Sequence, residues 1–177
     1  SFIKSQKLLS LAISKEGDLV TLNSSGDLLK IKAVDGTVDW SLNTAGSLLA
    51  HDTDFFESSE IVIGTDDIIF STASSTFSYN LFNGYLNWIK DINSNNTPII
   101  DGNNIFLVSD NGYFVNLDRN SGKIIRSTNI LKILKEKKQT TKITGFIMGS
   151  GKIYATTLNG YLIVCSVTSG SIEYFKK

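Results

Sequence analysis

The sequence predicts an all-β fold built from tandem repeats. Its apolar residues are rich in Ile, Leu and Val, and ten Phe and six Tyr accompany them. Branched and aromatic side chains of this kind suit the pleated, half-buried surface of a β-sheet. There are 14 Gly but only one Pro, so glycine marks most of the turns. Apolar and polar residues alternate on both sides of recurring glycines, which is the pattern of strands with one buried face.

Four glycines align four copies of one unit, and they are Gly36, Gly84, Gly122 and Gly170. An apolar residue stands two positions after each glycine. A large side chain stands four positions after it, and these are Trp40, Trp88, Arg126 and Tyr174. Because a glycine preceded by Asp, Asn or Ser forms a tight turn between alternating segments, each unit contains a hairpin.

A second turn lies ten residues earlier, at Gly26, Gly112 and Gly160. In the second unit either Ser74 or Ser75 takes this place. Two further short strands precede each second turn, so every unit has four strands in sequence. Repeated antiparallel meanders of four strands are the blades of a β-propeller. We therefore predict one partial propeller domain over 1–177, with blades at about 8–44, 60–93, 97–130 and 142–177.

The repeat glycines are 48, 38 and 48 residues apart, so two of the steps carry insertions. The first insertion falls around AGSLLAHDTDFFESSE and the second around NILKILKEKKQTTK. The second is predicted to form a short helix from Asn129 to about Lys138, which would need packing to be stable.

The amino-acid composition excludes several kinds of partner and metal site. Seventeen basic and 17 acidic residues give a formal net charge of zero, which argues against a nucleic-acid partner. One Cys excludes an intramolecular disulfide and a Cys-based zinc site, and one His excludes a multi-histidine metal site. No apolar run is long enough for a transmembrane helix, and the first residues lack a signal-peptide pattern.

Several residues are candidates for chemistry. His51 has acidic neighbours, Asp52 and Asp54, but no Ser or Cys nucleophile motif accompanies it. Cys165 occupies the repeat position of Ile31, Tyr79 and Leu117, which predicts a buried apolar group rather than a nucleophile. Carboxylates near strand ends could hold calcium, but the spacing of a calcium loop is absent and turn hydrogen bonding is favoured; they are Asp18, Asp66, Asp67 and Asp110. No catalytic residue, cofactor or metal site is predicted.

One local cluster of positive charge stands out. Five lysines of the second insertion surround a single acid, Glu136, and they are Lys132, Lys135, Lys137, Lys138 and Lys142. A cluster of this kind is a candidate contact for an acidic protein partner or anionic lipid headgroups. The alternative is a solvated loop.

The four-stranded unit resembles the PQQ-like β-propeller repeat, whose pattern is a small residue, an Asp two on, a Thr-Gly turn, and Trp four after the glycine. The third unit, NLDRNSGKIIR, is most similar, and the others read IKAVDGTVDW, SYNLFNGYLNW and VCSVTSGSIEY. Arg126 and Tyr174 depart from the pattern, which predicts a weaker tryptophan girdle between blades.

Within this family, the chain is most similar to the C-terminal half of BamB-like outer-membrane assembly lipoproteins, as the Lys-rich insertion also suggests. The resemblance implies four blades of an eight-bladed periplasmic scaffold, tethered to the outer membrane by a lipid. It further implies a noncatalytic role in inserting β-barrel proteins, with a barrel insertase as the partner. No lipobox cysteine lies near the start of the chain. An open arc also exposes the apolar faces of its end blades, which predicts self-association or adaptations at those faces.

Two alternatives remain open at this point. The chain could be part of a PQQ-dependent quinoprotein dehydrogenase, although one Cys cannot form the vicinal Cys pair typical of those enzymes. It could also belong to a sensor or adhesion ectodomain with a similar propeller. Upstream sequence would separate a lipobox, a cofactor site and a membrane anchor.

Overall fold

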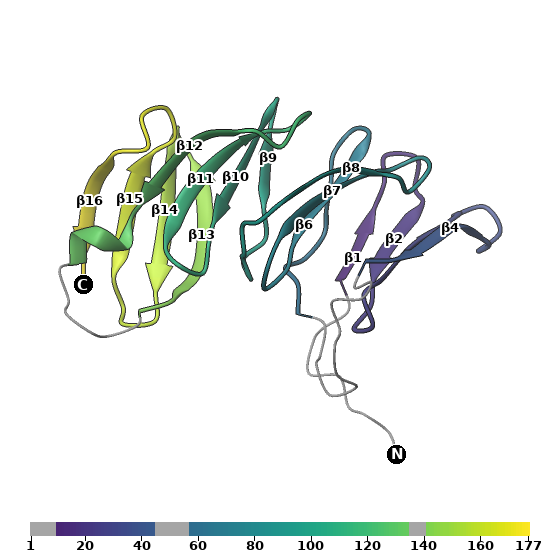
Figure 1. Cartoon of the computed structure of the whole chain (residues 1–177), viewed down its shortest axis with the longest axis horizontal. Helices are drawn as coiled ribbons and strands as arrows, with labels where there is room; N and C mark the ends of the chain where they lie inside the picture. The colour runs from purple at the N-terminus through teal and green to yellow at the C-terminus, as the bar shows by residue number, and fades with distance from the viewer. Residues whose placement is uncertain (1–9, 45–56, 135–140) are drawn as a thin grey trace, which may run out of the picture.

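The computed structural model describes residues 10–44, 57–134 and 141–177, and this part of the chain forms four antiparallel sheets. The sheets follow one another in chain order across the molecule, from the purple N-terminal sheet to the yellow C-terminal sheet (Figure 1). Each contains four strands in sequential order. The prediction of an all-β half-propeller with four-stranded blades is confirmed.

The strands are short, as the turn spacing predicted. Sheet 1 contains β1 (Ser10–Ile13), β2 (Leu19–Leu22), β3 (Asp27–Ile31) and β4 (Val38–Asn43). Sheet 2 contains β5 (Val62–Ile63), β6 (Asp67–Ser71), β7 (Thr76–Asn80) and β8 (Leu86–Lys90). Sheet 3 contains β9 (Ile99–Asp101), β10 (Asn104–Val108), β11 (Tyr113–Asp118) and β12 (Ile124–Asn129). Sheet 4 contains β13 (Ile143–Gly149), β14 (Lys152–Thr157), β15 (Leu162–Ser166) and β16 (Ile172–Lys176).

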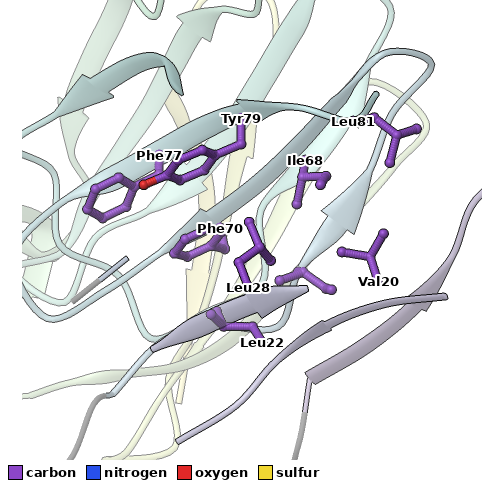
Figure 2. Packing of buried hydrophobic residues seen from close by; sticks show 9 residues of the cluster. Val20, Leu22, Leu28, Ile68, Phe70, Phe77, Tyr79 and Leu81 are labelled. Carbon is purple, nitrogen blue, oxygen red and sulfur yellow. The ribbon is translucent and has the colours of Figure 1, made fainter. Parts of the chain in front are cut away.

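Every sheet has two faces, because successive side chains of a strand point to opposite sides. We call the face turned toward the preceding sheet the leading face and the other the trailing face. Between sheets 1 and 2, Val20, Leu22 and Leu28 of the trailing face meet aromatic side chains of the next sheet. Figure 2 shows these aliphatic groups opposite Phe70, Phe77 and Tyr79.

The other two sheet junctions are filled differently. Between sheets 2 and 3 the buried cluster is aliphatic apart from one indole, and it contains Ile69, Trp88, Ile105, Leu107, Val115 and Leu117. Between sheets 3 and 4, Phe106 and Phe114 pack against small and aliphatic groups of β14 and β15. The core is therefore a series of layers between sheets rather than one central cluster.

The turns explain an ambiguity in the sequence. Gly26, Gly112 and Gly160 have positive φ values of 80°, 76° and 82°. Each is the last of three residues between an amide donor and its carbonyl acceptor, and these pairs are Asn23 and Asp27, Ser109 and Tyr113, and Thr157 and Tyr161. In sheet 2 the amide of Thr72 donates to the carbonyl of Ser75, which leaves only two residues between them. This turn is one residue shorter and needs no glycine, so the repeat register slips there.

The second insertion differs from the expected helix. Asn129 still belongs to β12, where it pairs with Tyr113, so no helix begins there. A short 3-10 helix, η2 (Leu131–Leu134), follows, and the Oδ1 atom of Asn129 accepts a hydrogen bond from the amide of Lys132. The rest of the predicted helix, to Lys138, lies outside the described residues. No helix in the described part of the chain is long and apolar enough to cross a membrane.

Candidate interaction sites

The side chain four positions after each of the first three repeat glycines makes a contact that links successive sheets. The Nε1 atom of Trp40 donates to the carbonyl of Leu81 at 3.2 Å, and that of Trp88 donates to the carbonyl of Arg119 at 2.8 Å. Both acceptors lie three residues before the next repeat glycine. We call this arrangement the rim contact.

The repeat glycines make room for the rim contact. A Cβ atom on Gly84 would lie 2.9 Å from the indole of Trp40, and one on Gly122 would lie 2.6 Å from the indole of Trp88. Each indole therefore lies against a backbone position where a side chain would clash with it. The φ values of these glycines, 73° and 63°, also disfavour other residues.

Arg126 takes the place of a tryptophan at the third junction. Its Nη1 atom donates to the carbonyl of Val167 at 3.3 Å, and a Cβ atom on Gly170 would lie 2.5 Å from its Cδ atom. Val167 is again three residues before the repeat glycine. The departure from the tryptophan pattern therefore does not interrupt the rim contact here, because the long apolar stem of Arg covers the glycine while its guanidinium reaches the carbonyl.

The Lys cluster is only partly described. Lys132 lies exposed on η2, and Lys142 lies exposed just before β13. Leu131 packs over Gly112, and the amide of Leu158 donates to the carbonyl of Lys142. These contacts place Lys132 and Lys142 on the side of the β10–β11 and β14–β15 turns. Lys135, Lys137 and Lys138 lie outside the described residues, as does His51.

A polar hollow of about 620 Å³ opens beside sheets 2 and 3. Its charged centre is an ion pair in which the Nη2 atom of Arg119 lies 2.7 Å from the Oδ1 atom of Asp67, and the Nε atom donates to Oδ2 at 2.9 Å. Hydrogen bonding to Asp67 raises the pKa of Arg119 above its ordinary value. The pair joins residues 52 positions apart, and sequence reasoning missed it.

Two other candidate carboxylates, Asp18 and Asp110, have structural partners. Asp18 lies 3.2 Å from the Nζ atom of Lys30 and accepts a hydrogen bond from the amide of Ala33. Asp110 accepts from both the amide and the Nδ2 atom of Asn95. Among the described residues, no three His, Cys, Asp or Glu side chains gather as they would around a metal ion.

Lys30 is the centre of a second missed network. It is a buried side chain on the trailing face of β3, and its Nζ atom also lies 3.2 Å from Asp39. Burial disfavours its charge, but hydrogen bonds to Asp18 and Asp39 outweigh this and raise its pKa. Lys30 stands two positions after Leu28 on the same face of β3 and pairs in register with Trp40. A lysine in this otherwise apolar pattern was the signal in the sequence that could have indicated the network.

Cys165 lies fully buried in β15, as its repeat position predicted. Burial raises the pKa of its thiol to about 11. At neutral pH the thiolate is therefore scarce, and the thiol is shielded from reagents.

Comparison with known proteins identifies the family. The family described as outer membrane protein assembly factor BamB matches residues 4–128, which is more than half of the chain. The chain belongs to this family. No curated protein matches the sequence significantly.

Solved structures agree on the fold. BamB from Moraxella catarrhalis is similar with a TM-score of 0.72 and 17% identity, over 98% of this chain and 51% of that one. The computationally designed protein Ika4 is similar with a TM-score of 0.66 and 12% identity, over 94% of this chain and 96% of that one. The WD40 domain of Neurospora crassa Pan2 gives 0.64 and 13%, over 94% of this chain and 48% of that one. This chain thus spans about half the length of the BamB chain.

Proposed function

We propose that this chain acts as a noncatalytic protein-interaction scaffold of the bacterial cell envelope. In this proposal it lies in the periplasm, is associated with the outer membrane, and assists the assembly of β-barrel proteins there. The observation that carries the proposal is the match of the BamB family to residues 4–128. One fold serves many functions, so the role needs a direct test.

The partner contact is proposed at the Lys cluster. Lys132 and Lys142 are exposed on one side of the arc, where two inter-strand turns also present backbone and side chains to solvent. Opposite charge on a partner would speed association and fix its orientation. The proposed partner is therefore a protein with an acidic surface in the complex that inserts outer-membrane barrels.

Crosslinked affinity capture from a native envelope extract tests this proposal, with mass spectrometry of the captured proteins. We expect a barrel insertase to be recovered. Capture of a cytochrome or of bound quinone instead would contradict the scaffold role and favour a dehydrogenase.

A double variant, Lys132→Glu with Lys142→Glu, tests the contact surface. We expect weaker capture and a shallower dependence on salt, because like charges then face the acidic partner. Lys123→Glu is the matched control, since Lys123 is exposed at the β11–β12 turn, the opposite end of β11 from Gly112. Equal capture by the double variant and the control would exclude the Lys cluster as the contact.

A further inference from the structure

The polar hollow beside sheets 2 and 3 has the size of a ligand site but not the usual apolar lining. Its volume of about 620 Å³ falls within the range of small-molecule sites, about 300–1,000 Å³. Such sites are walled mainly by hydrophobic and aromatic side chains. Every lining residue of this hollow is polar or charged, and four of them are asparagines: Asn80, Asn87, Asn103 and Asn120. The hollow therefore suits a ligand that is polar throughout.

The hollow is present because short neutral side chains occupy repeat positions that carry ion pairs in sheet 1. There, three ion-paired side chains fill the space beside the strands, and they are Lys30, Lys32 and Asp39. Their counterparts 48 residues later in sheet 2 are shorter and uncharged, and they are Ser78, Asn80 and Asn87. The space that long side chains occupy in sheet 1 is therefore left open in sheet 2.

One wall of the hollow is held in place by Arg119. Its Nε and Nη2 atoms donate to the two carboxylate oxygens of Asp67, and its Nη1 atom donates to the carbonyl of Gly102 at 3.3 Å. Asp67 is only 7% exposed. A Cβ atom on Gly64 would clash with both members of the pair, so the bare backbone there makes room for it. Because this wall is ordered before a ligand arrives, less free energy is lost in ordering it on binding.

The lining side chains retain donors and acceptors that no group in the described part of the chain uses. The Oδ1 atom of Asn103 accepts from the Nδ2 atom of Asn120 at 3.3 Å, which leaves the Nδ2 atom of Asn103 and the Oδ1 atom of Asn120. The Oδ1 atom of Asn80 accepts from two amides of its own turn, and its Nδ2 atom remains. The Nδ2 atom of Asn87 donates to a neighbouring hydroxyl, and its Oδ1 atom remains. The carboxylate of Asp66 adds a further acceptor.

Hydroxyl groups are the chemistry that this mixture of donors and acceptors recognises. A hydroxyl both donates and accepts, so a row of hydroxyls pairs equally well with amide donors, amide acceptors and a carboxylate. An anion is disfavoured, because the lining holds two carboxylates, Asp66 and Asp67, against the single guanidinium of Arg119. An extended peptide gains specificity from pockets for its alternate side chains, and these lining residues provide no apolar pocket.

We propose that the hollow binds a neutral saccharide unit, either as a free sugar or as part of a glycan chain. The hydroxyls of the sugar accept from the Nδ2 groups of Asn80 and Asn103. They donate to the Oδ1 atoms of Asn87 and Asn120 and to the carboxylate of Asp66. Burial of the sugar between the turns of two sheets lets one ligand contact both.

The hollow and the Lys cluster lie on opposite sides of the arc. Asn120 lies in the turn that joins β11 to β12, whereas Gly112, over which Leu131 packs, lies at the other end of β11. A sugar in the hollow therefore leaves Lys132 and Lys142 accessible to a partner. This inference does not depend on the proposed function, and either can fail without the other.

Two-dimensional ¹⁵N–¹H NMR of the 177-residue chain tests the proposal with the neutral disaccharides maltose, cellobiose and N,N′-diacetylchitobiose. We expect saturable shifts with at least one of them, with a dissociation constant of about 1 mM or tighter, centred on the side-chain amides of Asn80 and Asn103 and the backbone amide of Arg119. No saturable shift up to about 50 mM of any of them, or shifts centred elsewhere, would overturn the proposal. A response to triglycine alone would assign the hollow to peptides and would equally overturn it.

A longer sugar separates the two sources of the ligand. The tetrasaccharide of the responding sugar should bind more tightly than the disaccharide if the hollow takes part of a glycan chain, and equally if it takes a free sugar. Both results support the saccharide site. Loss of binding on lengthening a sugar at both of its ends, with the disaccharide still bound, identifies the free sugar.

Removal of the exposed amides tests which residues hold the sugar. The double variant Asn103→Ala with Asn120→Ala should weaken binding at least about tenfold, because it removes one donor and one acceptor of the hollow. Both residues are exposed, so the unfolding midpoint should stay close to that of the unchanged chain. Asn111→Ala is the matched control, since Asn111 is an exposed asparagine at the β10–β11 turn. An unchanged dissociation constant in the double variant would exclude these contacts.

Filling the hollow is an independent test. Asn80→Lys with Asn87→Asp introduces the residues that sheet 1 has at these positions, where the Nζ atom of Lys32 lies 3.3 Å from Asp39. We expect the longer, ion-paired side chains to occupy the space and to abolish saturable binding, while the chain stays folded by circular dichroism. Full affinity in this folded variant would show that the sugar does not use the hollow.

Discussion

The second and third sheet junctions use different residues to make the same rim contact. At the second, Trp88 lies on Gly122 and donates to the carbonyl of Arg119; at the third, Arg126 lies on Gly170 and donates to the carbonyl of Val167. Both side chains combine a donor with a broad or long apolar part. The repeat therefore preserves a contact between a donor, a bare glycine and a backbone carbonyl, rather than a residue type.

Removing the indole at the second junction should have the largest effect. Trp88 is 8% exposed and belongs to the cluster between sheets 2 and 3. We expect Trp88→Ala to lower the free energy of unfolding by about 3–5 kcal/mol, from lost burial and the cavity left behind. Urea denaturation followed by circular dichroism measures this change. A loss below about 1 kcal/mol would mean that the indole is peripheral to stability.

The glycine under the indole should come next. Gly122→Ala combines the strain of a positive φ with a clash against Trp88, and we expect a loss of about 2–4 kcal/mol. Gly102→Ala is a matched control, because its φ of 55° is close to the 63° of Gly122 but nothing lies within 4 Å of its Cβ position. The control should lose only about 1 kcal/mol. Equal losses would show that backbone strain alone, and not the rim contact, requires glycine.

Truncation at the third junction should have a smaller effect than at the second. We expect Arg126→Ala to cost about 1 kcal/mol, because it removes one partly buried hydrogen bond and some apolar contact. Chemical denaturation compares it directly with Trp88→Ala. An equal or greater loss would make arginine the stronger rim residue and reverse the comparison.

Cys165 reports on the opening of the third junction alone. Its thiol is buried there and its pKa is about 11, so alkylation at pH 8 should be slow in the native protein and fast after unfolding. Arg126→Ala should speed native-state labelling several-fold by easing local opening, whereas Tyr85→Lys, at an exposed turn of sheet 2, should not. Mass spectrometry follows the labelled fraction. An unchanged labelling rate of Cys165 in Arg126→Ala would show that the thiol becomes accessible through an opening that does not involve this contact.

The first junction should differ from the third in its response to acid, and this effect should be the smallest. Lys30 pairs in register with Trp40, where the third junction has Asn116 beside Arg126. A backbone hydrogen bond from Ala33 and the bond to Lys30 lower the pKa of Asp18, and bonding to Lys30 lowers that of Asp39. Their contribution to stability is present above the ordinary value of 3.8 and is lost as the pH falls through the lowered values.

Lys30→Met should therefore flatten the decline of stability below about pH 4, because Asp18 then loses its ammonium partner and Asp39 keeps only Lys32. Unfolding by urea between pH 5 and 2 measures the slope, with Lys90→Met as the control. The same acid dependence in both variants would show that this ion-pair cluster does not contribute.

The repeated elements were predictable because their causes are local. Period-two alternation and glycine turns lie within ten residues of one another, so strand order and the burial of Cys165 could be predicted from the sequence. The shorter turn at Thr72 and Ser75 hid one register, since it lacks the glycine that marks the others. The predicted helix does not begin at Asn129, because Asn129 pairs in the sheet, and a 3-10 turn follows at Leu131–Leu134.

The ion pairs were not predictable in the same way. Arg119 meets Asp67 only because two sheets pack side by side, and nothing in either local pattern indicates the other residue. Arg126 was expected to weaken the tryptophan girdle because arginine differs from tryptophan in residue type. In the structure Arg126 still makes the rim contact, through its bond to the carbonyl of Val167. Lys132 and Lys142 of the candidate partner surface could be identified from the sequence. The side of the arc on which they lie could not be predicted, because it depends on how η2 packs.

The sequential order of strands has a consequence for how the chain melts. Each sheet closes within one short stretch of sequence, and the described sheets touch only their neighbours, as in linear repeat proteins. Stability then behaves as a sum of unit and nearest-neighbour terms. Among the described sheets, sheets 2 and 3 each pack against two neighbours, so their amide hydrogens should exchange only in openings that break two junctions.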